Sequence, residues 1–200
     1  MARKPRDIVA GAIYHITARA NRQEMIFEDD AIKDLMLETI KRAKDKYNFS
    51  FKNFCIMGNH IHFDMQPRGD AEISDIMRWI LGVFALRYNK IFKLKGHVWY
   101  DRFKSKVIET IEQYVNTFRY IANNPVRARM VDHPLNYAYS GITCYKKNNL
   151  MSILDPPDET IKAIINEFLA MYLPEKARQT DENYSFMDKK PGRKKKSETI

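Results

Sequence analysis

Polar and apolar side chains alternate strictly along the stretch Asn59-His60-Ile61-His62-Phe63-Asp64-Met65-Gln66. Successive side chains of a β-strand project to opposite faces, so this pattern predicts a strand whose apolar residues face a core. His60 and His62 then share the other face with Asp64 and Gln66. Two imidazoles two residues apart on a strand stand side by side, close enough for one metal ion to take a nitrogen from each. A hydrogen-bonded or solvated pair of histidines is the commoner alternative.

A helical pattern occupies residues 109–125. Its apolar residues recur at intervals of three and four and form one stripe: Ile111, Tyr114, Val115, Phe118, Ile121 and Ala122. Pro125 is expected to end this helix, because proline has no N–H to donate. At about 100° per residue, Tyr120 points almost opposite the stripe, with Asn124 one turn further on the same face. Tyr114 lies at the edge of the stripe and is expected in the core, whereas Tyr120 and Asn124 could converge on whatever the two histidines hold.

The apolar periods of the chain predict four strands and four helices. The strands cover residues 11–18, 50–57, 60–66 and 103–109, and the helices begin near Asp29 or Asp30 and then cover 74–92, 110–124 and 161–172. Gly58 and Asn59 form a turn of the kind that closes a tight hairpin. The order β-α-β-β-α-β is the ferredoxin-like, or split βαβ, plan, an α+β fold in which helices cover one side of an antiparallel sheet. The last helix could dock on this core or contact a partner.

Four segments carry a resemblance to a known family. They read Tyr14-His-Ile-Thr-Ala-Arg-Ala-Asn-Arg-Gln-Glu-Met-Ile-Phe27, Ile56-Met-Gly-Asn-His-Ile-His62, Val98-Trp-Tyr-Asp-Arg-Phe-Lys-Ser105 and Tyr120-Ile-Ala-Asn-Asn-Pro-Val-Arg-Ala128. In this order and spacing, the chain resembles the single-tyrosine HUH transposases, and among them the REP-associated tyrosine transposases. It departs from that family at Gly58, where proline is usual, and at Ala138-Tyr139-Ser140, where a tryptophan and two serines are common.

The resemblance implies an HUH endonuclease fold and a set of site residues. By analogy, His60 and His62 are metal ligands, Asn124 can supply a third ligand, and Tyr120 is the nucleophile. The implied reaction is metal-dependent cleavage and rejoining of single-stranded or hairpin DNA through a 5′-phosphotyrosine link. The family implies Mg²⁺ or Mn²⁺, although ligand softness alone would also allow Zn²⁺ or Ni²⁺. Asp64 could accept a hydrogen bond from a ligand histidine and so orient it, or it could be a solvated carboxylate.

Basic and aromatic residues near these segments are candidate DNA contacts. The candidates for phosphate binding are Arg19, Arg22, Arg102, Lys104 and Arg127, and those for base stacking are Trp99 and Tyr100. Exposed arginines are more often only solvated, and a tryptophan is more often part of the core.

Composition agrees with a nucleic-acid partner. The chain has 34 Lys and Arg against 25 Asp and Glu, a formal net charge of +9 that attracts polyanions. Its two cysteines suggest no disulfide framework, and no signal peptide or membrane span is recognised, so a cytoplasmic location is expected. We expect a transposase domain over residues 1–145, a linker and amphipathic helix over 146–175, and a basic, disordered tail over 176–200.

Two other functions remain open from the sequence. A replication or plasmid-transfer initiator would use the same HUH chemistry, and a catalytically silent relative would only bind DNA and regulate. The active protein could be a monomer or a homodimer that exchanges its tyrosine helices.

Overall fold

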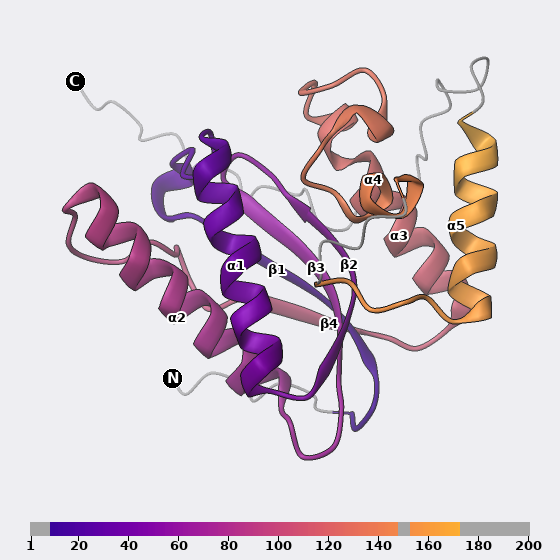
Figure 1. The fold of residues 1–200 in the computed structure, drawn as a ribbon, viewed down its shortest axis with the longest axis horizontal. Coiled ribbons are helices and arrows are strands. Elements are labelled where there is room, and N and C mark those ends of the chain that lie inside the picture. The colour runs from indigo at the N-terminus through magenta and orange to yellow at the C-terminus, as the bar shows by residue number, and fades with distance from the viewer. Residues whose placement is uncertain (1–8, 148–152, 173–200) are drawn as a thin grey trace, which may run out of the picture.

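A single antiparallel sheet of four strands organises the fold (Figure 1). The computed structural model describes residues 9–147 and 153–172. The strands lie in the order β2-β3-β1-β4, with bounds β1 Ile13–Arg19, β2 Phe49–Ile56, β3 His60–Pro67 and β4 Lys104–Ile108. The N–H of Met57 donates to the carbonyl of His60 at 2.8 Å, which confirms the tight hairpin at Gly58 and Asn59. The predicted strands are therefore confirmed, with ends displaced by one or two residues.

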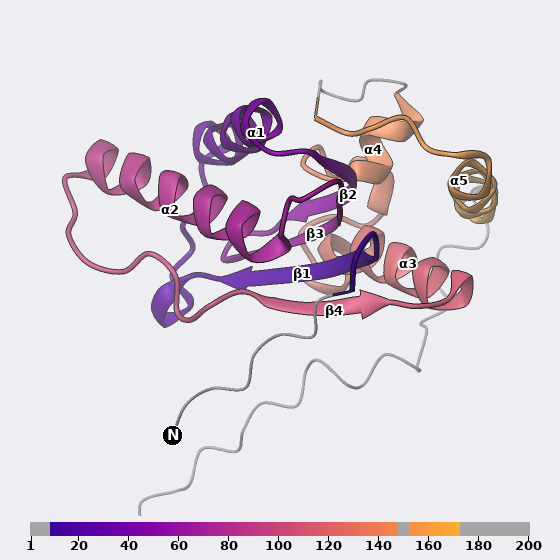
Figure 2. The same ribbon diagram turned by 90° about the horizontal axis from the view of Figure 1, so that it is seen from below.

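Two helices, α1 (Asp30–Lys46) and α2 (Ile73–Phe92), cover one face of the sheet and pack against each other (Figure 2). Asp29 caps α1 by accepting a hydrogen bond from the N–H of Ala31 at 2.8 Å. The main core lies between these helices and the sheet. The apolar residues of β3, Ile61, Phe63 and Met65, are all 0% exposed in that core, as the alternation predicts.

The third helix, α3 (Ile111–Arg127), covers the opposite face. Ile16 of β1 belongs to the main core, whereas Ile13, which points the other way, packs against a second cluster that contains Tyr114 and Phe118 of α3. The expectation of helices on one side only is therefore wrong. The apolar stripe of α3 needs its own surface to bury, and this second face of the sheet supplies part of it.

Pro125 does not end α3, contrary to the prediction. The helix continues through Arg127, so Pro125 lies inside its last turn. Proline removes one N–H donor there, but the turn is closed by other bonds: the N–H of Ala128 donates to the carbonyl of Asn124 at 2.9 Å, and that of Met130 donates to the carbonyl of Pro125 at 2.9 Å. A proline so close to the C-terminus costs the helix little.

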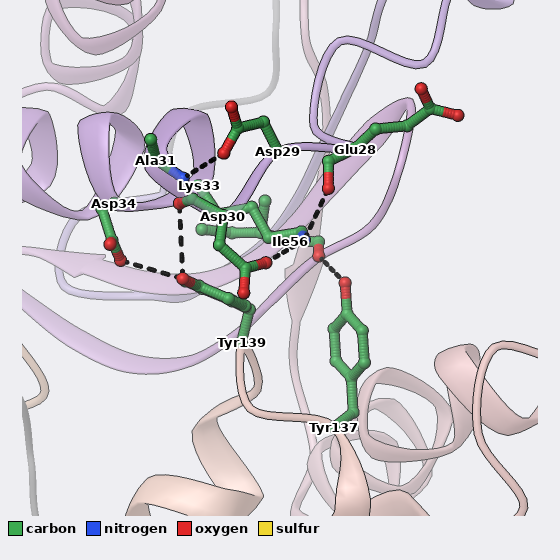
Figure 3. Close-up of polar contacts among 9 residues, drawn as sticks. All are labelled: Glu28, Asp29, Asp30, Ala31, Lys33, Asp34, Ile56, Tyr137 and Tyr139. Carbon is green, nitrogen blue, oxygen red and sulfur yellow. Dashed lines mark hydrogen bonds and ion pairs between the residues drawn. The ribbon is translucent and has the colours of Figure 1, made fainter.

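The sequence predicts no helix between the end of α3 and residue 161, but the structure has two short helical elements there. They are a 3₁₀ turn, η2 (Pro134–Asn136), and a short helix, α4 (Gly141–Lys146), which contacts β2. Two tyrosines attach this segment to the rest of the fold (Figure 3). The O–H of Tyr137 donates to the carbonyl of Ile56 at 2.5 Å, and the O–H of Tyr139 donates to the carboxylate of Asp34 at 3.1 Å. The outer edge of β2 is therefore covered along part of its length.

The last described helix, α5 (Glu159–Met171), docks on α3, which answers the question that its apolar stripe left open. The ring of Phe168 meets that of Phe118 edge-on, with centroids 5.8 Å apart. The O–H of Tyr172 also donates to the amide oxygen of Asn123 in α3. The connector before α5 is held as well, since the N–H of Asp155 donates to the carbonyl of Phe51 at 2.9 Å. α3 thus lies between the sheet and α5.

Two findings concern the ends of the chain and membranes. Among the described residues, no helix is both long and apolar enough to cross a lipid bilayer. The predicted basic tail, residues 176–200, falls outside the described residues.

Candidate active site

The pairing of β1 with β3 builds the floor of the candidate site. In this register His15 lies opposite Asp64, Thr17 opposite His62, and Arg19 opposite His60, so these side chains share one face of the sheet. The alternation along residues 59–66 predicts that face correctly. It does not predict its burial: His62 is 3% exposed and Asp64 0%, so a solvated carboxylate is ruled out. The cause is α3, which covers the polar face of the sheet.

Tyr120 of α3 lies over the histidines. Its ring is edge-on to the imidazole of His62, with centroids 5.4 Å apart, and the rings of His60 and His62 are 4.9 Å apart. Asn124 is 9% exposed one turn further along α3, and its amide N–H donates to the carbonyl of Tyr120 at 3.0 Å. The extra turn that contains Pro125 carries Arg127, whose guanidinium lies 5.4 Å from the centre of the Tyr120 ring. Residues predicted from two separate segments therefore meet.

His15 is a member of this cluster that sequence reasoning missed. Its Nδ1 lies 2.9 Å from Oδ1 of Asp64, and its Nε2 lies 3.4 Å from Nδ1 of His62. The ring of His15 is 3% exposed and lies nearly parallel to that of His62. Two signals could have found it: the alternation within residues 13–19 places His15 on the same face as Arg19, and the resemblance included the segment that begins at Tyr14.

Burial sets the protonation of the cluster. It holds the pKa of His62 well below its usual range, and the nearby His60, His15 and Arg19 add to the effect. Burial raises the pKa of Asp64, while the hydrogen bond from His15 opposes that rise. His62 is therefore neutral at pH 7, which is the form of imidazole that can bind a metal.

The donor set fits a divalent metal ion. Nε2 of His62 is buried and has no hydrogen-bond partner among the described residues. Nδ1 of His60 lies 2.7 Å from the amide oxygen of Asn59 and donates to it, so Nε2 is the nitrogen of His60 that carries no proton in the neutral ring. Within residues 9–147 and 153–172, no three His, Cys, Asp or Glu side chains gather into a metal-binding group. Asn124, one turn from Tyr120 on α3, carries an amide oxygen that can serve as a third ligand beside the two imidazoles.

Three of the candidate DNA-binding residues lie next to the cluster: Arg19, Lys104 and Arg127. Arg19, Arg102, Lys104 and Arg127 are exposed, and Arg22 is exposed in a short 3₁₀ turn, η1 (Asn21–Gln23), directly after β1. Lys104 pairs with Thr17 across β1 and β4. Tyr100 is 73% exposed, and its N–H donates to the carbonyl of Arg19 at 3.0 Å. A basic border with one exposed aromatic ring thus adjoins the histidines.

Trp99 has a different environment from its neighbour Tyr100. Its ring packs 5.5 Å from that of Phe84 and 6.3 Å from that of Phe27, and its indole N–H donates to the carbonyl of Leu81 at 2.9 Å. This is the packing role that a tryptophan more often has. Of the two rings, Tyr100 is the more accessible to a base.

Comparisons with known proteins identify a family for the chain and a solved structure with a similar fold. A family model described as "Transposase IS200 like" matches residues 8–124, more than half of the chain. The fold is similar to the structure of a REP-associated tyrosine transposase bound to a REP hairpin, with a TM-score of 0.64 and 21% identity over 79% of this chain and 93% of the other. A transposase candidate from Deinococcus radiodurans R1 aligns with a TM-score of 0.42 and 17% identity, over 61% of this chain and 97% of the other. No curated protein matches the chain.

Proposed function

Because the chain belongs to the IS200-like transposase family, we propose that it cleaves and rejoins single-stranded DNA with Tyr120 as the nucleophile. The observation that carries this proposal is the position of the Tyr120 ring, 5.4 Å from His62 and on the same side of the sheet as His60. A phenol and two imidazoles in one half-buried cluster suit a reaction in which an oxygen attacks a phosphate held beside it.

The reaction exchanges one phosphoester for another. The phenol oxygen of Tyr120 forms a bond to phosphorus, and the bond from phosphorus to the 3′ oxygen of the preceding nucleotide breaks. The phenol proton is lost and the departing 3′ oxygen takes up a proton, which leaves a free 3′-hydroxyl and a 5′-phosphotyrosine. The link keeps the energy of the original ester, so a 3′-hydroxyl can reverse the step and join a new strand.

His60, His62 and Asn124 would hold the divalent ion, Mg²⁺ or Mn²⁺. When bound, the ion supplies Lewis-acid polarisation of a non-bridging phosphate oxygen. The chain itself prepares two of these residues for binding. Burial keeps the imidazole of His62 neutral, and the side chain of Asn124 is held in place by its hydrogen bond to the carbonyl of Tyr120. The phenol of free tyrosine has a pKa of about 10, so the site must favour loss of this proton during attack.

The proposed substrate is a DNA hairpin or repeat with an accessible single strand. The related transposase structure contains a REP hairpin, which supports this choice. Arg19 and Lys104 are exposed beside the cluster and suit phosphate contacts, and Tyr100 suits stacking on an unpaired base. Arg22, Arg102 and Arg127 extend the same basic border, while Trp99 is proposed only to support it from the core.

A covalent-adduct assay tests the proposal. Labelled hairpin DNA is incubated with the protein and Mg²⁺ or Mn²⁺, and a denaturing gel is examined for a protein-linked label. The wild type should form the adduct and Tyr120→Phe should not, although both bind the hairpin equally. Tyr114→Phe is the matched control, because Tyr114 is 4% exposed in the same helix and should leave adduct formation intact.

The other outcomes distinguish the alternatives. Hairpin binding without an adduct in the wild type would indicate a silent DNA-binding regulator. An adduct that survives in Tyr120→Phe and disappears in Tyr114→Phe would show that the nucleophile is assigned to the wrong face of α3.

A further inference from the structure

We propose that His15 and Asp64 are positioning residues that fix the tautomer of His62 and keep its Nε2 unprotonated, in the form that can bind a metal ion. This inference rests on the proposed function, because it assumes that His62 is a ligand. It gives a role to two polar residues that are buried beside His62.

Three side chains form one continuous line of hydrogen bonds. Oδ1 of Asp64 lies 2.9 Å from Nδ1 of His15, and Nε2 of His15 lies 3.4 Å from Nδ1 of His62. All three are at most 3% exposed, so water does not compete for these groups at the surface. The register of β1 with β3 places His15 directly opposite Asp64, which holds the first contact in place.

With both imidazole rings neutral, two arrangements of protons satisfy this line. A neutral imidazole carries one N–H and one nitrogen lone pair. A ring that donates a hydrogen bond from one nitrogen therefore accepts one at the other. If the carboxylate of Asp64 accepts from Nδ1 of His15, then Nε2 of His15 is an acceptor, Nδ1 of His62 carries the proton, and Nε2 of His62 has the lone pair. If Asp64 is protonated and donates, every bond reverses and Nε2 of His62 carries a proton.

The surroundings of His62 favour the first arrangement. In the reversed one, Nε2–H of His62 would be a buried donor with no acceptor among the described residues, whereas Oδ2 of Asp64 lacks a partner there in both arrangements and does not distinguish them. In the first one, the same nitrogen presents a lone pair, which a metal ion can take up. In many metal sites a carboxylate accepts a hydrogen bond from the second ring nitrogen of a ligand histidine and so orients the ring. Here His15 lies between the carboxylate of Asp64 and the imidazole of His62.

The test reads the tautomer directly in the metal-free protein. Long-range ¹H–¹⁵N spectra of ¹⁵N-histidine-labelled protein at neutral pH should show His62 protonated at Nδ1 in the wild type. Asp64→Asn keeps the side-chain size but lets an amide N–H donate to His15, so His62 should shift towards the Nε2–H form. His15→Phe removes the line and should give mixed tautomers, whereas His15→Gln keeps an acceptor for His62 and should retain much of the preference.

Calorimetric titration with Mn²⁺ gives the second readout. Asp64→Asn and His15→Phe should weaken binding about 10- to 100-fold, the usual effect of removing such a partner. The exposed His97 provides the control, because His97→Gln should leave both readouts unchanged. Circular dichroism shows which variants are folded. If His15→Phe does not fold, Asp64→Asn alone tests the inference.

The outcomes separate this inference from the proposed function. A wild type with Nε2–H on His62, or folded Asp64→Asn with unchanged tautomer and Mn²⁺ affinity, would overturn the role of the pair. A wild type that binds no Mn²⁺ and forms no DNA adduct would overturn the proposed function, whatever tautomer His62 has.

Discussion

His60 and His62 differ in burial although they stand two residues apart on one strand. His62 is 3% exposed and contacts His15, whereas His60 lies at the end of β3 and is only half-buried. Asn124, the proposed third ligand, offers a neutral amide oxygen. The three proposed ligands are therefore unequal, and loss of the Asn124 amide should have a smaller effect than loss of either imidazole.

We expect His60→Ala and His62→Ala to abolish measurable Mn²⁺ binding and adduct formation, because each removes a ligand nitrogen. Asn124→Ala should weaken binding less, since a water molecule can replace an amide oxygen. Calorimetric titration measures the affinities, with Gln66→Ala, on the same strand face, as the control. Unchanged affinity in both histidine variants would contradict the metal site.

The buried His62 also predicts how stability depends on pH. The pKa of His62 in the folded chain is well below the value of about 6.5 in an unfolded chain. Below pH 6.5, His62 therefore binds a proton in the unfolded state but not in the folded state. The metal-free protein should lose up to about 1.4 kcal/mol of unfolding free energy per pH unit on this account as pH falls below 6.5. The raised pKa of Asp64 acts with the opposite sign.

Urea unfolding of wild type and His62→Gln between pH 7 and 5 measures this effect. The difference between the two proteins isolates His62, because Asp64 is present in both. The stability of the wild type should fall more steeply than that of the variant, while His97→Gln should follow the wild type. Parallel curves for wild type and His62→Gln would show that His62 takes up its proton equally in the folded and unfolded states, which would contradict the lowered pKa.

The sequence predicted some members of the cluster and missed others for a physical reason. The shared face of His60 and His62 follows from the two-residue period of a strand, which is a local property. The contact between His15 and Asp64 joins residues 49 positions apart and depends on the register of β1 against β3. No periodicity within one segment contains that information.

At the scale of elements, long amphipathic segments were predicted and short ones were not. The stripes of α1, α2, α3 and α5 extend over several turns, so their period is evident. η2 has three residues and α4 has six, too few for a helical period to appear. Pro125 was misjudged because its missing N–H matters less in a last turn whose neighbouring bonds remain.

The docking of α5 on α3 makes a quantitative prediction. Phe168 is 2% exposed against Phe118, and truncation of such a ring costs about 3–5 kcal/mol. Phe168→Ala should therefore lower the unfolding free energy by about that amount in urea. Lys162→Ala on the exposed side of α5 is the control and should change it by less than about 0.5 kcal/mol. Equal, small effects would show that α5 is detached in solution.

At the scale of the molecule, one chain supplies every group of the proposed site. Tyr120 lies 5.4 Å from His62 of its own chain, so no second copy is required to bring them together. An exchange of tyrosine helices between copies would place the same groups at the same distances by another route. The two cases differ in what a mixture of inactive variants can do.

We expect a mixture of Tyr120→Phe and His62→Ala to form no covalent DNA adduct. Each copy in that mixture lacks either the phenol of Tyr120 or the imidazole of His62. If both groups must come from one chain, no copy has a complete site. The measurement is the denaturing gel used for the wild type, run at several protein concentrations. Adduct formation that rises with concentration would demonstrate exchange of α3 between copies.

The position of β4 has a consequence for motion. β4 has five residues, is hydrogen-bonded in the sheet only to β1, and is joined by Glu109 and Thr110 to the start of α3. Regions with few buried contacts open at low free energy, so the amide of Ile108 should exchange with solvent faster than that of Ile61 in the sheet interior. Tyr120 is thus tethered, through α3, to a short edge strand. We expect partial opening at this edge to shift α3, and with it the proposed nucleophile Tyr120, while β1 and β3 beneath the histidines stay paired.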